Sequence, residues 1–354
     1  MPSDVHEFRI IDNETAIIAI YQPRQYSLEA YNIPSGWVVD GVFQEINITT
    51  KEVLFEWRSL DHVPLSDTYS PLGATEVIGN GQNETTAWDY FHINSVDKNS
   101  EGDYLVSARH TSCIYKISGQ DGSVDWRLGG KQSSISLTDY NFSAQHDARF
   151  REENETHTVL SLFDNASDKH RTTSPTSSGK IVTIDHTTNS STLTKQYQAP
   201  GAGILSISQG NLQVLPQGNV FIGWGSNPSI SEHTETGTPV YFATLLGPGL
   251  MNYRAFKANW TAHPIERPTL NASASSTAGE NTTTFWVSWN GATDVKFWNF
   301  YATLDGSDQF ALLAKADNNG FQTTLTSSDH HPQAFVEGLS ADELSLGNSS
   351  IVAL

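Results

Sequence analysis

The chain has a single cysteine, Cys113, among its 354 residues. One thiol can form no intrachain disulfide and no zinc site built from several thiolates, so neither the core nor the chemistry depends on sulfur ligands. We expect Cys113 to be a small buried residue of a strand.

Basic residues are scarce, with 20 Lys and Arg against 39 Asp and Glu and a formal net charge of -19. Nucleic acids and anionic membrane surfaces are held by clustered Lys and Arg, so neither is expected as a partner. The sequence also has no apolar run approaching the ~20 residues of a membrane span. Composition and charge therefore argue against these two classes of partner.

The amino terminus, MPSDVHEF, contains neither the basic region nor the apolar region of a secretory leader. Acceptor sequences for N-glycosylation are nevertheless frequent and occur at Asn13, Asn47, Asn83, Asn141, Asn154, Asn165, Asn189, Asn259, Asn271, Asn281 and Asn348. We interpret the chain as a glycoprotein of a secretory lineage that carries no leader of its own.

Long helical periodicity is nearly absent, whereas short alternating runs separated by Gly, Asn, Asp and Ser recur throughout. This pattern predicts an all-β protein. One unit of roughly four strands, the size of a β-propeller blade, recurs from Glu7 to Trp57, Asp89 to Leu128, Phe142 to Tyr197 and Ile207 to Leu246. A propeller closes when its terminal strands meet, so either a segment around Leu246 to Trp260 completes the ring or the chain is a shortened form of a larger propeller.

The composition changes after Pro264. Alternating segments such as FWVSWNGA and VKFWNFYATLD follow, which are typical of a small β-sandwich resembling a fibronectin-like or immunoglobulin-like module. We therefore divide the chain into a propeller over residues 1–264 and a sandwich over 265–354.

Polar side chains of catalytic type stand at corresponding places in successive units, where the innermost strand begins. In a propeller such residues meet at one mouth of the central channel. His92 and Asn94, two residues apart, are predicted to share a strand face, whereas Arg109 and His110 are predicted to point to opposite faces, which favours Arg109 as the binder of an anionic group and His110 as a structural residue. The five elements are His6-Glu7, His92-x-Asn94, Arg109-His110, Gln145-His146-Asp147 and Asp164-Asn165.

Several segments resemble the arylsulfotransferase family in its fungal branch: DVHEF, FHINSVD, SARHTSCIYKI, DWRLGGK, QHDARF, LFDNA and VSWNGAT. The match is ordered and runs over nearly the whole chain. The resemblance implies a six-bladed propeller that moves a sulfuryl group from an aryl sulfate to a phenol, through a sulfated histidine and without a nucleotide or other cofactor. Because the family has further blade strands ahead of its HEF motif, it also implies a propeller that is incomplete at the amino terminus.

The resemblance assigns the nucleophile to His146, the HxN pair to His92 and Asn94, the arginine to Arg109 and the HEF histidine to His6. These residue types suit the reaction, since a neutral imidazole is a competent nucleophile and Arg, imidazole and amide donors stabilise negative charge on sulfonate oxygens. His6 is then the group that exchanges a proton with the phenol.

Four further residues are predicted to contact the substrate or to orient the nucleophile. Trp224 and Tyr253 are candidates to hold the aromatic acceptor, and Asp147 and Asn165 are polar candidates, with Asp147 also a candidate to orient His146. No metal ligand set is expected.

Other functions stay open at this point. A nucleotide-dependent sulfotransferase is disfavoured because Gly129-Gly130-Lys131-Gln132 lacks the spacing and the hydroxyl residue of a phosphate-binding loop. A quinoprotein-like propeller, a non-catalytic binding module, and a fungal metabolite cyclase or isomerase using the same His and Arg residues for acid-base chemistry are the alternatives.

Overall fold

The computed structural model describes residues 3–277, 280–304 and 306–354. It divides the chain into two compact units, Met1–Lys257 and Ala258–Leu354. The boundary lies seven residues before the one that we placed at residue 264 (264 − 257).

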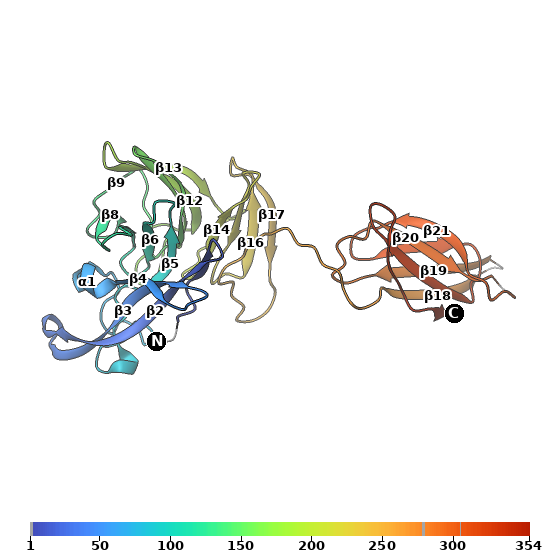
Figure 1. Cartoon of the computed structure of the whole chain (residues 1–354), viewed down its shortest axis with the longest axis horizontal. Coiled ribbons are helices and arrows are strands. Elements are labelled where there is room, and N and C mark those ends of the chain that lie inside the picture. Colours follow the sequence, from blue (N-terminus) through green and yellow to red (C-terminus); the bar gives the residue numbers. More distant parts are fainter. Residues whose placement is uncertain (1–2, 278–279, 305) are drawn as a thin grey trace. The chain divides into compact units, whose positions relative to one another are not determined.

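The first unit consists of four successive antiparallel sheets, which follow one another from blue to yellow in Figure 1. The first sheet contains β1 (Phe8–Ile11), β2 (Thr15–Leu28), β3 (Ile33–Asn47) and β4 (Val53–Arg58), and the second contains β5 (Ile93–Lys98), β6 (Tyr104–Ala108), β7 (Cys113–Ile117) and β8 (Val124–Gly129). The third contains β10 (His146–Glu153), β11 (His157–Asp164), β12 (Ser178–Asp185) and β13 (Ser190–Tyr197), with β9 (Ser136–Thr138) parallel to β13. The fourth contains β14 (Asn211–Val214), β15 (Val220–Gly223), β16 (Ser229–His233) and β17 (Pro239–Thr244).

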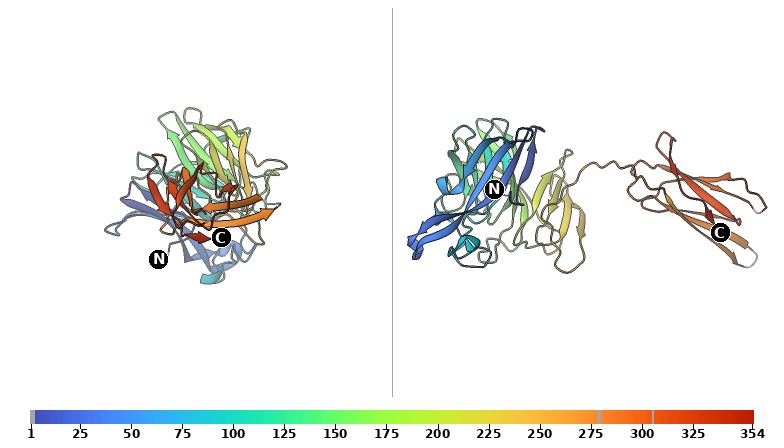
Figure 2. Two further views of the ribbon diagram at one scale, coloured as in Figure 1. Left: turned by 90° about the vertical axis from the view of Figure 1, so that its right-hand side faces the viewer. Right: turned by 60° about the horizontal axis from the view of Figure 1, so that its bottom comes forward.

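These sheets confirm the predicted all-β propeller architecture, and each coincides with one of the four repeat units. The resemblance implied six blades, whereas the described residues up to 257 form four. Helices are short: α1 (Ser59–His62), and the 3-10 turns η1 (Glu29–Tyr31), η2 (Leu65–Asp67) and η3 (Glu84–Thr86). Among the described residues, therefore, no helix has the length and apolar character needed to cross a membrane. The hairpin of β2 and β3 projects beyond the neighbouring strands (Figure 2).

Strand alternation explains how the sheets stack. Tyr104 and Val106 of β6 pack in the same buried cluster as Phe43 of the first sheet. Leu105, which lies between them, packs with Leu160 of the third sheet. Because successive side chains of a strand point to opposite faces, one buried strand contributes to the cores on both of its sides.

The first strands of the sheets lie side by side. The backbone N–H of Val96 in β5 donates to a carboxylate oxygen of Glu7, which precedes β1, and Ala148 N–H of β10 donates to Ser95 Oγ of β5. Leu212 N–H of β14 donates to Asp147 of β10. These hydrogen bonds between sheets gather the starts of the first strands into one region.

The segment that follows β17 contacts both the fourth sheet and the residues just before the first. Asn211 of β14 bonds the backbone of Ala255 through both its amide nitrogen and its amide oxygen, at 2.7 Å each. On the other side Tyr253 Oη donates to the His6 carbonyl, and the guanidinium of Arg254 forms an ion pair with Glu7. Residues 253–255 thus lie within the segment from Leu246 to Trp260, which one of our two alternatives assigned to completing the ring.

The second unit is a β-sandwich of two sheets, as predicted. One sheet contains β18 (Thr269–Thr277), β19 (Glu280–Ser288) and β22 (Thr323–Ser327), and the other β21 (Ala311–Asp317), β20 (Phe297–Ala302), β23 (Gln333–Leu339), β24 (Ser345–Asn348) and β25 (Val352–Ala353). Phe285 and Val287 of the first sheet pack against Phe300 and Val336 of the second.

Candidate functional site

Three of the predicted histidines gather where the first strands begin. His6 lies just before β1, His92 just before β5, and His146 is the first residue of β10. The ring centres of His6 and His92 are 4.9 Å apart, and those of His92 and His110 are 4.4 Å apart. His146 interacts electrostatically with Arg109, His92 and His6. We call His6, His92, His110, His146 and Arg109 the histidine cluster.

The geometry of His92 and Asn94 differs from the prediction. His92 precedes the strand with a left-handed backbone (φ 57°), and a register shift between Ile93 and Ser95 places Asn94 in a bulge. The rule that residues two apart share a face requires a regular strand, so it does not apply here. Asn94 Nδ2 donates to the Gln145 carbonyl at 2.8 Å, and Oδ1 is buried without a partner among the described residues.

Arg109 and His110 do not point to opposite faces, because β6 ends at Ala108 and both residues lie in the turn that follows it. Arg109 Nη1 lies 2.7 Å from His110 Nε2, and His110 Nδ1 lies 2.6 Å from the Asp89 carbonyl. A guanidinium and a carbonyl fix the tautomer, with the proton on Nδ1 and Nε2 accepting from Arg109. His110, which we predicted to be merely structural, therefore holds the arginine in place.

For the sulfuryl transfer that the family resemblance implies, we expect His110→Ala to lower kcat by roughly 10- to 100-fold, because displacing a group that positions a catalytic side chain costs about that much in rate. His110→Gln supplies an acceptor for Arg109 and a donor for the Asp89 carbonyl, so it should recover most of the loss. Steady-state kinetics of both variants check this. If His110 acted only in packing, the alanine variant would lose thermal stability with kcat unchanged.

His146 is 4% exposed and its ring is held from two sides. Nδ1 lies 2.7 Å from Asn165 Oδ1 and 3.1 Å from the Ala144 carbonyl, and the Gln209 backbone N–H donates to Nε2 at 3.2 Å. Asn165 Nδ2 donates to the carbonyls of Ser206 and Gln209, which leaves Oδ1 to face the imidazole. The proton therefore sits on Nδ1, and Nε2 carries the lone pair. Asn165 orients His146, and with its side chain fully buried it cannot accept a glycan in the folded protein.

Burial and nearby positive charge keep the imidazoles of His146, His92 and His110 neutral. Burial, and next the charge of Arg109, holds the pKa of His146 well below 6.5. Burial, followed by the charges of His6 and Arg109, likewise lowers the pKa of His92 well below 6.5, and burial lowers the pKa of His110 to about 3. A neutral imidazole is the form that can act as a nucleophile.

These shifts predict that acid destabilises the first unit. The folded protein keeps three imidazoles neutral, those of His92, His110 and His146, whereas in the unfolded chain they titrate near pH 6.5. Because the unfolded chain therefore binds more protons below pH 6.5, the folded state loses stability as the pH falls. The loss between pH 7.5 and 5.5 is about 1.4 kcal/mol per histidine, or roughly 4 kcal/mol for the three. Urea unfolding across this range measures it. His146→Asn should reduce the loss by about a third, whereas a variant at His263, whose side chain is 70% exposed, should leave it unchanged; equal slopes in both variants would contradict the prediction.

Two carboxylates that sequence reasoning missed partner the histidines. The Asp4 carboxylate bonds His6 Nδ1, and the Asp89 carboxylate bonds His92 Nδ1. The spacings, Asp-x-His and Asp-x-x-His just ahead of a first strand, were the available signal. In both pairs the carboxylate fixes the ring and turns Nε2 away from itself.

Asp89, His92 and His110 also have potential ligand atoms within 4.8 Å of one another. Their spacing would suit a metal ion, but His110 Nε2 already accepts from a guanidinium and His92 Nδ1 bonds the carboxylate. Each imidazole is thus oriented by hydrogen bonds to other groups of the protein.

The remaining predicted residues fall in three different places. Tyr253 has its ring 5.7 Å from that of His6 and so borders the histidine cluster. Trp224 is fully buried, with its ring 5.7 Å from Phe163 and its Nε1 donating to Ser231 Oγ, so it packs in the core and offers no surface to a substrate. Asp147 forms an ion pair with Arg149 and does not orient His146, a task that falls to Asn165.

A family model for arylsulfotransferase (ASST) matches residues 2–244, well over half of the chain. The chain belongs to the arylsulfotransferase family. The matched range contains the whole histidine cluster, and membership supports an arylsulfotransferase-like transferase function in general. No curated protein matches the chain by sequence.

Similar solved structures come from diverse proteins. One is a protein of unknown function from Bacteroides caccae, with 9% identity, a TM-score of 0.35 and coverage of 95% of this chain and 93% of that chain. Hydrazine synthase from Kuenenia stuttgartiensis has 8% identity and a TM-score of 0.31, with coverage of 87% of this chain and 63% of that chain. The Cps50 (Swd1) β-propeller domain of Myceliophteria thermophila has 7% identity and a TM-score of 0.30, with coverage of 99% of this chain and 89% of that chain. At these scores the likenesses carry no argument about the arylsulfotransferase site.

Proposed function

We propose that this member of the arylsulfotransferase family transfers a sulfuryl group between phenols through a sulfohistidine at His146. His146 Nε2 attacks the sulfur of an aryl sulfate, the S–O bond to the aryl group breaks, and the phenolate leaves with the electron pair. His6, which starts the cycle protonated on both ring nitrogens, donates its Nε2 proton to that phenolate and becomes neutral. A second phenol then returns a proton to His6 and attacks the same sulfur, and the S–N bond breaks so that its electron pair returns to Nε2.

The remaining cluster residues stabilise the charge that develops on the sulfonate oxygens. Arg109 keeps a buried Nε donor without a partner among the described residues, while its other nitrogens bond His110 and the Ile207 carbonyl. A fixed cationic donor in a buried site stabilises an anionic transition state strongly. His92, oriented by Asp89, and Asn94 complete the proposed set.

The observation that carries the proposal is the tautomer of His146. Two acceptors at Nδ1 and one donor at Nε2 fix the lone pair on Nε2, and the lowered pKa keeps it unprotonated at neutral pH. When Nε2 attacks sulfur, the hydrogen bond from the Gln209 N–H is released and that donor becomes free for a sulfonate oxygen.

A chromogenic aryl sulfate mixed with an unsulfated phenol tests the function. We expect release of the coloured phenol to depend on the second phenol, with the sulfated acceptor appearing in equal amount. Release that is unaffected by any acceptor would assign the cluster to hydrolysis. Neither release nor transfer with a folded protein would instead favour acid-base chemistry on a metabolite or a binding role. We also propose that the chain belongs to the fungal branch of the family and that it is secreted.

A further inference from the structure

A cavity of about 330 Å³ opens beside the first strands of the propeller unit, apart from the histidine cluster. Its size falls within the usual range of small-molecule sites. It is lined by Glu7, Phe8, Arg9, Asp147, Arg149, Arg151, Leu212, Gln213, Arg254 and Phe256. Four arginines in one cavity stand out in a chain with a net charge of -19.

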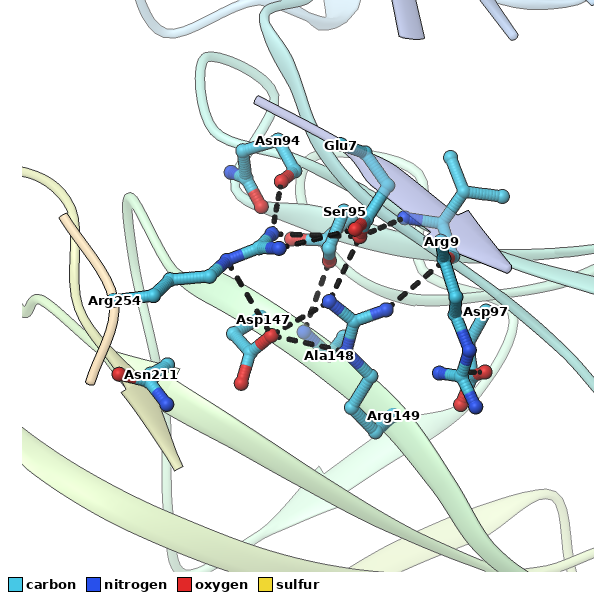
Figure 3. A network of polar contacts seen from close by, with 12 residues as sticks. Glu7, Arg9, Asn94, Ser95, Asp97, Asp147, Ala148, Arg149, Asn211 and Arg254 are labelled. Carbon is cyan, nitrogen blue, oxygen red and sulfur yellow. Dashed lines mark hydrogen bonds and ion pairs between the residues drawn. The ribbon is translucent and has the colours of Figure 1, made fainter. Parts of the chain in front are cut away.

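An ion-pair network connects several of the residues that line this arginine cavity (Figure 3). Arg149 lies between Glu7 and Asp147, with Nη2 at 2.7 Å from each, and Arg254 Nη1 lies 3.0 Å from Glu7. Arg9 pairs with Asp97. Three of the four guanidinium groups are thereby matched by carboxylates.

Arg151 is the unmatched cation. Its Nε donates to Ser161 Oγ at 2.7 Å and its Nη2 to the Leu212 carbonyl at 3.3 Å, both neutral acceptors. No carboxylate of the described residues lies within ion-pair distance of it, and its side chain is solvent-exposed. The cavity therefore has a surplus positive charge that two hydrogen bonds hold in place. A guanidinium with free donors is suited to a sulfonate or carboxylate group.

Two phenylalanines add an apolar part to the same cavity. Phe8 of β1 is 68% exposed and Phe256, in the segment after β17, is 62% exposed, and both line the cavity. Exposed aromatic rings beside cationic groups suit a ligand with an aromatic body and one anionic group.

The cavity adjoins the histidine cluster along the chain. Three of its lining residues directly follow a residue in or beside the cluster: Glu7 follows His6, Asp147 follows His146 and Arg254 follows Tyr253. We propose that the arginine cavity is a second binding site, for a small aromatic monoanion, held by Arg151 and the two phenylalanines. This inference goes beyond the proposed transfer reaction and does not depend on it.

Calorimetric titration of the full chain with benzenesulfonate tests the proposal, because its carbon–sulfur bond cannot be transferred. We expect two equivalents to bind. Arg151→Gln should weaken one of them by about tenfold or more, the effect of losing a charge-assisted hydrogen bond, and Arg151→Lys should retain most of that affinity. Arg109→Gln should remove the other equivalent.

The outcomes separate the two sites. Loss of binding with Arg109→Gln alone, with Arg151→Gln like the wild type, overturns the cavity proposal and leaves the transfer function standing. Loss with Arg151→Gln alone supports the cavity and counts against the histidine cluster as a sulfonate site. Phe256→Ala should weaken benzenesulfonate but not methanesulfonate, and equal affinity of the wild type for both anions overturns the aromatic part. Thermal unfolding of each variant verifies that it is folded.

Discussion

His146→Ala is expected to abolish sulfuryl transfer, with a fall in kcat of about 10⁴-fold or more, as found when a covalent nucleophile is removed. The reason is that the proposed reaction bonds the sulfuryl group to His146 Nε2 alone: His110 Nε2 accepts from Arg109, and His6 and His92, whose Nδ1 atoms bond carboxylates, have other roles in that reaction. Initial rates with a chromogenic aryl sulfate and an excess of phenol measure the loss.

A matched control is His157→Ala, since His157 starts β11 in the same unit and bonds Glu152 at the surface, away from the cluster. Its rate should equal that of the wild type. Rapid acid-free quenching and mass spectrometry should find one added SO3 group on His146 in the wild type and none in His146→Ala. A variant that keeps a tenth of the wild-type rate would assign the nucleophile to another residue.

Glu7→Gln is expected to destabilise the propeller unit by about 3–5 kcal/mol, the usual cost of removing one partner from a buried ion pair. Glu7 is 2% exposed and accepts from Arg149, Arg254 and the Val96 N–H. Burial alone would raise the pKa of Glu7, but the charges of Arg149 and Arg254 outweigh it and hold the pKa below 4.5. A neutral amide leaves the buried guanidinium of Arg149 and the half-buried guanidinium of Arg254 undercompensated.

The corresponding shift of the unfolding midpoint is roughly 6–20 °C for a unit of this size, measured by calorimetry. Glu101→Gln changes the charge equally at an exposed turn and should shift the midpoint by less than about 2 °C. Equal midpoints for the two variants would mean that the first and third sheets and residues 253–255 are joined by packing alone. The same measurement reports on ring closure, because Glu7 links all three.

Part of the site could be predicted because the fold repeats. Alternating runs and turn residues located all four sheets, and the equivalent positions of His6, His92 and His146 placed them at the starts of first strands. The orientation rules failed where the backbone leaves the regular strand, as at His92, with its φ of 57°, and at Arg109 and His110 beyond the end of β6. Trp224 was misjudged because a Trp of a blade can face the core or the channel, and the sequence pattern does not distinguish these.

The sequence by itself determined the all-β class, the blade units and the residue types available for chemistry, because strand periodicity and turn propensity are local properties. Only the tertiary structure decided which partners those residues have: Asn165 on His146, His110 on Arg109, and Arg254 on Glu7 across 247 positions of the chain. Such pairings depend on how separate sheets stack around one region. The resulting burial sets the protonation state of each imidazole, and no local pattern in the chain encodes that burial.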